Sequence, residues 1–273
     1  MDREALIFLH IPKTAGTTLN RIIEWQYSPF AIFTMDPYRI RATAERLKQL
    51  PEARRRRLQV VRGHLSYGVH EFLPQGATYI TMLRDPVARV LSAYYFVLRR
   101  PLNPLHWKLK RERLGVEDCL RLFPDRQNLQ CRFIAGVKDT VTGDERLLAI
   151  AKENLTRSFS VVGISERFEE SLMLMATIFA WEIPFYENCR VAKTRPQIDP
   201  GAVEMIRDYN RLDLELYEFG TGLFEESLQK NEAAVREGLA ALRTLPKPGS
   251  VQGFCNSTLG AGRFLVNKIA SAV

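Results

Sequence analysis

The feature that most constrains the fold of this chain is an apolar run near residue 5 that leads directly into a polar turn. Residues 5–11 read ALIFLHI, a pattern typical of a strand buried on both faces of a parallel sheet. Pro12 ends the run, and after the polar residues 13–18 apolar positions recur at helical spacing from Leu19 to Trp25. The chain is therefore predicted to open as strand, tight loop and helix.

Strands and helices are predicted to alternate along the rest of the chain. Further short strands are expected at 59–61, 79–83, 159–164 and 187–191. Helices are expected at 86–98, 117–123, 129–134, 146–155, 169–181, 201–219 and 225–242. Residues 99–115 are basic and contain proline, which predicts a loop or lid. This alternation predicts an α/β fold of three layers, in which helices flank a central, mainly parallel sheet.

A length of 273 residues permits one large α/β domain or two small ones and alone does not decide between them. Residues 1–245 are predicted to form one domain, and residues 246–273 to form a C-terminal extension whose role the sequence does not indicate. The four cysteines are widely spaced and form no C-x-x-C pair, which is typical of reduced thiols. No signal-like segment opens the chain, and no apolar stretch reaches the roughly 18 residues that span a bilayer. We therefore expect a cytoplasmic protein without a transmembrane segment.

The charge of the chain is basic, with 39 Lys and Arg against 31 Asp and Glu. A net charge of +8 favours anionic partners, including phosphorylated cofactors, acidic glycans, nucleic acid and membrane surfaces. Much of it lies in two runs, 54–57 and 108–113, which a solvated helix face would explain equally well. The sign of the charge alone selects no partner.

The loop after the first strand has the composition of an anion-binding site. Backbone N–H groups and the positive end of the helix dipole point to one spot in such a strand–loop–helix unit. Lys13 adds a full positive charge, and Gly16 permits close approach of a ligand. Hydroxyl donors are further expected from Thr14, Thr17 and Thr18. The order is not that of a Walker A loop. An ordinary helix cap at Thr17 is the alternative.

A second anion-binding pair is predicted one strand further on. Arg84 ends the predicted strand 79–83, and Ser92 lies nearly two turns into the helix that follows. Open α/β sheets bind ligands at the carboxyl ends of their strands, and a guanidinium suits a terminal phosphate. Taken alone, Arg84 could equally form a local ion pair with Asp85.

Together these segments resemble those of sulfotransferases that use 3′-phosphoadenosine-5′-phosphosulfate (PAPS). Residues 9–18, LHIPKTAGTT, are similar to the 5′-phosphosulfate loop of the carbohydrate branch that includes heparan 2-O-sulfotransferase. Residues 83–95, LRDPVARVLSAYY, are similar to the 3′-phosphate motif of that family. Softer similarity at 162–168 and 195–217 extends the resemblance over roughly residues 5–220. It implies a P-loop-like fold.

The resemblance assigns roles to individual residues. It implies that Lys13, Thr14, Ala15, Gly16, Thr17 and Thr18 hold the 5′-phosphosulfate of PAPS. Arg84 and Ser92 would hold the 3′-phosphate. Arg195 matches a late basic position on the nucleotide side, with a surface arginine as the alternative. The implied reaction is sulfuryl transfer from PAPS to a hydroxyl of a carbohydrate or glycoconjugate.

His64 is the candidate general base. It follows a predicted strand and Gly63, so its side chain should reach the same sheet edge as the donor loop. The Gly-His-x-x-aromatic setting is similar to that of the catalytic histidine in the carbohydrate enzymes, although a structural histidine is the alternative. Lys13 would stabilise the leaving phosphate in an in-line displacement, so no metal ion is expected. His10 is predicted to orient the turn instead.

The acceptor is not identified by the sequence, and two other functions stay open. Arg62, Arg99, Arg100 and the run 108–113 would suit an anionic carbohydrate acceptor, but solvated loop charge explains them as well. Nucleic acid is not expected as a partner. A P-loop-type kinase or NTPase is the first alternative function, and the missing Walker A order argues against it. A non-catalytic polyanion-binding protein of the same fold is the second.

Overall fold

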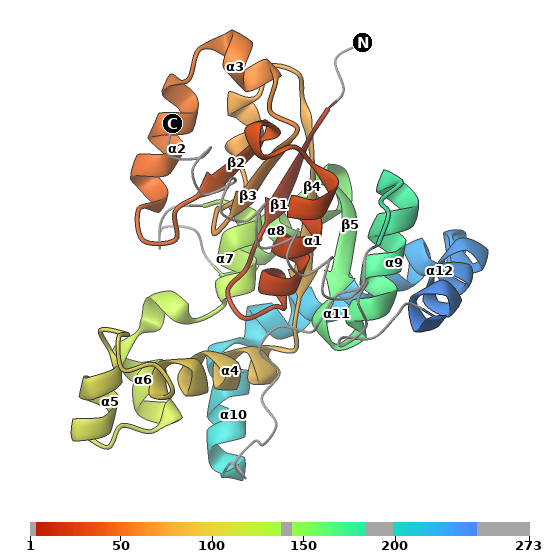
Figure 1. Cartoon of the computed structure of the whole chain (residues 1–273). Coiled ribbons are helices and arrows are strands. Elements are labelled where there is room, and N and C mark those ends of the chain that lie inside the picture. Colours follow the sequence, from red (N-terminus) through yellow and green to blue (C-terminus); the bar gives the residue numbers. More distant parts are fainter. Residues whose placement is uncertain (1–3, 138–143, 184–198, 245–273) are drawn as a thin grey trace.

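The computed structural model describes residues 4–137, 144–183 and 199–244, and its centre is a parallel β-sheet (Figure 1). The strands are β1 (Ala5–Leu9), β2 (Ile32–Met35), β3 (Val60–Gly63), β4 (Ala77–Leu83) and β5 (Phe159–Ile164). Their order is β2-β3-β1-β4-β5, and every neighbouring pair is parallel. Helices flank the sheet, so the predicted α/β fold class is confirmed.

The helices of the described residues fall between and after these strands. They are α1 (Gly16–Gln26), α2 (Ile40–Gln49), α3 (Glu52–Arg56), α4 (Pro86–Leu98), α5 (His106–Arg111), α6 (Val116–Leu122), α7 (Leu129–Ala135), α8 (Asp144–Ser158), α9 (Phe168–Phe179), α10 (Pro200–Tyr209), α11 (Arg211–Lys230) and α12 (Glu232–Thr244). No helix among them combines the length and the apolar character needed to cross a bilayer.

The central strand β1 is buried along its whole length, as its apolar run predicts. In register, Ile7 lies opposite Val61 of β3 on one side and Tyr79 of β4 on the other. Burial on both faces favours apolar residues at every position of such a strand, which removes the polar alternation of a half-exposed strand. The strand therefore anchors the loop that follows it in the middle of the molecule.

A second, smaller apolar cluster holds α4, α6 and α10 together, away from the sheet (Figure 1). Its buried members are Val116, Leu120, Ala202 and Ile206. Helix α5 lies in this part too, so the prediction of a loop over 99–115 is wrong for residues 106–111. The first residue of α5, His106, packs this helix against α4: its side chain is buried, and its Nδ1 lies 3.1 Å from the carbonyl oxygen of Val97.

Two other predictions of local structure differ from the fold. Strand β2 and helix α2 were not predicted, because the polar residues around them hide a short apolar edge strand. The predicted helices 201–219 and 225–242 are three helices, and α11 runs without a break through Gly220. A Cβ on Gly220 would lie 2.3 Å from Leu83 Cδ1, so this glycine allows close packing on β4 and does not end the helix. The predicted strand at 187–191 and the extension 246–273 lie outside the described residues.

Candidate functional site

The parallel sheet brings the candidate residues to one edge. All five strands of the described part end on the same side, and β1 lies between β3 and β4. His10 follows β1, His64 follows β3 and Arg84 follows β4, so the three positions neighbour one another. The chain moves to one side of β1 with β2 and β3, and to the other side with β4 and β5. Ligands bind at such a switch point in open α/β sheets.

The loop after β1 has an unusual backbone. Lys13 has φ of 75° and Ala15 has φ of 63°, both in the left-handed region that residues other than glycine rarely adopt. Helix α1 begins directly after Ala15, and no side chain caps it. The alternative of an ordinary helix cap at Thr17 is therefore wrong, since Thr17 lies within the first turn of α1. Left-handed residues before an uncapped helix form a concavity of N–H groups that suits an anion.

The side chains of Thr14 and His10 pack on the inner side of this loop. Thr14 is fully buried, and its hydroxyl donates to the carbonyl oxygen of Ile11 at 2.9 Å. In this structure the hydroxyl thus donates within the turn, and its predicted use as a ligand donor stays a prediction. A Cβ on Gly16 would lie 2.0 Å from the imidazole Cδ2 of His10, so the start of α1 requires glycine to let that ring pack against it.

The two predicted anion-binding segments are in direct contact. The guanidinium Nη1 of Arg84 donates to the carbonyl oxygen of Lys13 at 2.8 Å. The Lys13 ammonium lies 4.1 Å from the ring centroid of Phe96 on α4, the same helix that carries the partly exposed Ser92. Arg84 also forms an ion pair with Glu166, at 3.6 Å between Nε and Oε1. The loop, the arginine and α4 thus form one continuous basic site.

The carbonyl of His10 sets the tautomer of His64. Its oxygen lies 2.7 Å from His64 Nδ1, and a carbonyl oxygen can only accept a hydrogen bond. The hydrogen of a neutral His64 ring is therefore on Nδ1, and Nε2 carries the lone pair. Burial lowers the pKa of His64 below its ordinary value, although the bond to His10 opposes this. His64 is thus a neutral imidazole with a basic nitrogen at near-neutral pH.

The ring of His10 contacts His64 and Asn20. Its centroid lies 4.4 Å from that of His64, and Asn20 Nδ2 donates to its Nδ1 at 3.3 Å. Burial, followed by the charges of His64, Arg62 and Lys13, lowers the pKa of His10 well below its ordinary value. These contacts agree with the prediction that His10 orients the turn.

Arg62 does not face an acceptor. Its guanidinium is buried and pairs with the buried carboxylate of Glu24 on α1. It also donates to the backbone oxygen of Asn20 at 2.9 Å. The prediction that Arg62 lines an acceptor cleft is wrong, because this arginine braces β3 against α1.

Three polar residues of this edge were missed in the sequence. Glu166 accepts a hydrogen bond from Tyr217 at 3.2 Å in addition to pairing with Arg84. Ser165 precedes it, and its buried hydroxyl makes no hydrogen bond within the described residues. Gln130 bonds to the backbone of Arg84. The motif at 162–168 could have indicated the first two, whereas Gln130 is too far along the chain for any local signal.

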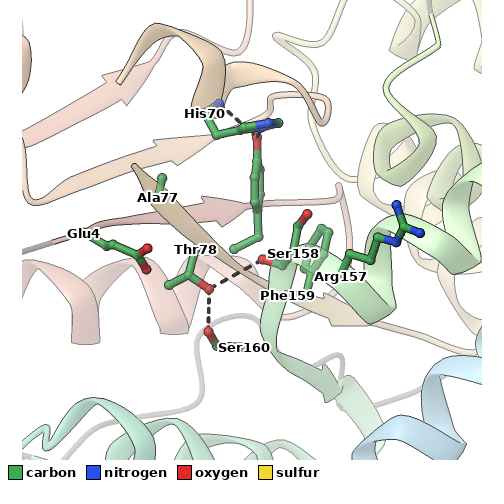
Figure 2. A pocket seen from close by; sticks show the side chains of 9 residues that line it. Glu4, His70, Ala77, Thr78, Arg157, Ser158, Phe159 and Ser160 are labelled. Carbon is green, nitrogen blue, oxygen red and sulfur yellow. Dashed lines mark hydrogen bonds between the residues drawn. The ribbon is translucent and has the colours of Figure 1, made fainter. Parts of the chain in front are cut away.

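A pocket of about 250 Å³ lies at the other edge of the sheet, near the amino ends of β4 and β5 (Figure 2). Thr78 and Ser160 share a hydrogen bond in its wall, and Tyr79 also lines it. None of the predicted site residues lines this pocket. Within the described ranges, no group of three or more histidines, cysteines or acidic residues is placed to hold a metal ion.

Comparison with known families decides the relationship of this chain. Residues 1–247 match the galactose-3-O-sulfotransferase family. The chain belongs to the galactose-3-O-sulfotransferase family. The resemblance to carbohydrate sulfotransferases that the two motifs predicted is thereby confirmed.

Individual members of related groups are similar over much of this chain. Galactosylceramide sulfotransferase of Homo sapiens is 25% identical over 203 residues, covering 65% of this chain and 46% of that protein. Heparan sulfate 2-O-sulfotransferase 1 of Gallus gallus is 25% identical over 197 residues, covering 64% of this chain and 54% of that protein. Heparan-sulfate 6-O-sulfotransferase 3 of Homo sapiens is 25% identical over 283 residues, covering 82% of this chain and 58% of that protein. The chain thus spans about half the length of these curated relatives.

The galactose-3-O-sulfotransferase match includes all of the predicted site residues. The structure brings Lys13, the loop through Thr18, His64 and Arg84 to one sheet edge, and it places Ser92 on the adjoining helix α4. Arg195 lies outside the described residues. The roles of these residues remain predictions.

Proposed function

We propose that this chain transfers a sulfuryl group from PAPS to a hydroxyl of a carbohydrate or glycolipid. Membership of the galactose-3-O-sulfotransferase family supports the reaction class. The observation that carries the proposal is the hydrogen bond from Arg84 to the Lys13 carbonyl, at 2.8 Å. This bond brings together a loop suited to the 5′-phosphosulfate and an arginine suited to the 3′-phosphate. PAPS carries both groups, so its binding requires the two to lie close together.

The donor chemistry of the site fits PAPS. The loop offers backbone N–H groups at the uncapped start of α1, where the helix dipole favours negative charge. Lys13 and Arg84 supply two positive charges, and Ser92 lies on the next helix with a hydroxyl donor. PAPS supplies the sulfuryl group and the leaving phosphate. The residues of this edge bind and orient those anionic groups.

In this mechanism His64 removes the proton of the acceptor. Its Nε2 has the free lone pair because Nδ1 donates to His10. As the acceptor oxygen forms its bond to sulfur, the bond from sulfur to the phosphate oxygen breaks, and the proton moves to Nε2. The acceptor becomes a sulfate ester, and the nucleotide leaves as 3′-phosphoadenosine-5′-phosphate.

Lys13 acts on the other side of the transferred group. Negative charge develops on the leaving phosphate oxygen, and a preorganised cation there lowers the barrier. The left-handed backbone of Lys13 fixes where its side chain leaves the loop, and its ammonium lies over the Phe96 ring. The first acceptor to test is a terminal galactose with a free 3-hydroxyl, as the family description indicates.

The decisive experiment is calorimetric titration with 3′-phosphoadenosine-5′-phosphate in the absence of Mg²⁺. We expect micromolar binding by the wild type and at least a tenfold loss in Arg84→Ala, because a charged hydrogen bond to phosphate is removed. Arg99→Ala removes an exposed arginine of the same region and should bind normally. Absence of binding by folded wild-type protein would overturn the proposal, and transfer from labelled PAPS to a galactoside would extend it.

A further inference from the structure

One buried side chain from another helix makes two hydrogen bonds to the main chain of Arg84. Gln130 of α7 accepts a hydrogen bond from the Arg84 N–H at 3.0 Å and donates one to the Arg84 carbonyl at 2.9 Å. The Gln130 side chain is fully buried. Arg84 stands at the joint between β4 and α4, where the strand ladder has ended. These two bonds therefore fix both peptide planes of the arginine.

Gln130 is itself held in place by α11. The Asp213 carboxylate accepts from the backbone N–H groups of Gln130 at 3.1 Å and of Cys131 at 2.8 Å. In return, the side-chain oxygen of Asn128 accepts from the N–H groups of Leu212 and Asp213, at 3.1 Å and 3.3 Å. Each helix thus caps the first turn of the other, which leaves Gln130 little freedom to move.

A buried cation ties this pair of helices back to α4. Arg89 is almost fully buried, and its Nη2 lies 3.9 Å from Asp213 Oδ2 and 3.4 Å from Asn210 Oδ1. Arg89 belongs to α4, which begins at Pro86, two residues after Arg84. The contacts that run from Arg84 through Gln130 and Asp213 to Arg89 therefore form a closed loop that includes the main chain of Arg84.

We propose that Gln130 is a positioning residue that aims the Arg84 guanidinium at the 3′-phosphate of the donor nucleotide. Fixing both peptide planes of Arg84 fixes the direction of its Cα–Cβ bond, and with it the range of its guanidinium. The adjacent bond from Arg84 to the Lys13 carbonyl then needs no further ordering when the nucleotide binds. This inference rests on the proposed function, and it concerns a residue that does not touch the ligand.

The test compares two nucleotides that differ only at the 3′ position. Gln130→Met keeps the size of the side chain but removes both hydrogen bonds to Arg84. We expect about tenfold weaker binding of 3′-phosphoadenosine-5′-phosphate, and unchanged binding of adenosine 5′-phosphate, which lacks the 3′-phosphate. In an Arg84→Ala background the same substitution should have no further effect. Gln127→Met is the matched control, because Gln127 bonds to the Leu120 carbonyl instead.

A purely structural role gives a different pattern. Equal weakening of both nucleotides, or no weakening of either, would overturn the proposal. Gln130→Glu provides a second variant that retains the acceptor for the Arg84 N–H and loses the donor, so an intermediate loss is expected. If Gln130→Met does not fold, this variant decides on the same two nucleotides.

A readout without ligand separates this inference from the proposed function. The Arg84 amide should exchange slowly with deuterium in the wild type and at least tenfold faster in Gln130→Met, which removes its acceptor. Gln130→Glu retains that acceptor and should stay closer to the wild type, and the Gln127→Met control should match the wild type. Unchanged exchange in Gln130→Met would show that Gln130 does not hold Arg84 and would overturn the inference. Wild-type protein that binds neither nucleotide would refute the proposed function and this role together, even with protected Arg84.

Discussion

The hydrogen on His64 Nδ1 decides what this residue can do. The His10 carbonyl takes that hydrogen in a bond of 2.7 Å, so Nε2 is the nitrogen left for chemistry. The lowered pKa keeps the ring neutral, and a neutral ring is the form that accepts a proton. A backbone carbonyl thus does for this histidine what a carboxylate does in many hydrolases: it selects the tautomer.

His64→Asn should lower kcat by about 10²- to 10⁴-fold and leave the binding of 3′-phosphoadenosine-5′-phosphate unchanged, because only proton removal is lost. Steady-state kinetics and calorimetry on the same preparation measure the two effects. His70→Asn is the matched control, since His70 bonds to Tyr79 at 2.9 Å and lines the pocket at the other edge of the sheet.

The pH profile is the second measurement on these proteins. Because burial lowers the pKa of His64, the acid limb of the wild-type kcat/KM should lie below about pH 6.5, the ordinary histidine value. The limb should disappear in His64→Asn. A variant that retains more than about a tenth of kcat would contradict the assignment of His64 as base.

Local signals in the sequence predicted some of these residues and could not predict others. His64 and Arg84 each follow a strand directly, and Lys13 lies in the loop after β1, so strand position alone places them at the binding edge. Gln130 is 46 residues from Arg84 and is placed by the packing of α7 on α11. Arg62 follows the predicted strand 59–61 but lies within β3, and its side chain turns inward because Glu24 on α1 offers it a buried partner.

At the scale of elements, α7 and α11 depend on each other for their first turns. Asn128 has φ of 48°, and its side chain caps α11 across 84 residues of sequence. The sequence predicted a helix at 129–134, close to the observed α7, since its apolar pattern is local. It did not predict that α11 begins after Asn210, because that start is set by side chains from α7 and α4.

Asn128→Gly should destabilise the protein by about 1–3 kcal/mol, because two buried N–H groups on α11 lose their acceptor. Glycine retains the left-handed backbone, so the substitution removes only the cap. Urea denaturation measures the effect. Asn103→Gly is the control: its side chain caps a single half-buried amide, that of Leu105, at 3.0 Å, and its loss should cost less, about 0.5–1 kcal/mol. Equal destabilisation by both variants would contradict the reciprocal capping.

At the scale of the whole molecule, the parallel sheet brings the candidate site residues together at one edge. The alternation of strands and helices was sufficient to predict that the loops after β1, β3 and β4 share one edge. The order of the strands was not predictable in this way, because β2 was not recognised in the sequence and its place at the edge depends on pairing with β3. The separate cluster of α4, α6 and α10 was also missed, since its apolar residues come from distant parts of the chain.

The central position of His10 and His64 makes the stability of the whole molecule sensitive to acid. Both folded-state pKa values are lowered, by burial first and for His10 also by the charges of His64, Arg62 and Lys13. Below about pH 6.5 the unfolded chain therefore binds more protons than the folded one, and the free energy of unfolding falls as pH falls. Above that pH both rings are neutral in the folded and the unfolded chain, so this loss of stability is absent.

Between pH 7.5 and 5.5 the free energy of unfolding should drop by at most about 1.4 kcal/mol for each of these histidines, one pKa unit of linkage. Carboxylates of ordinary pKa stay ionised over this range, so the window isolates histidine. Urea denaturation at the two pH values measures the drop in the wild type and in the His10→Asn/His64→Asn double variant, which should lose most of it. An equal drop in both proteins would place the acid sensitivity elsewhere, and would mean that the two rings are already solvated at the binding edge.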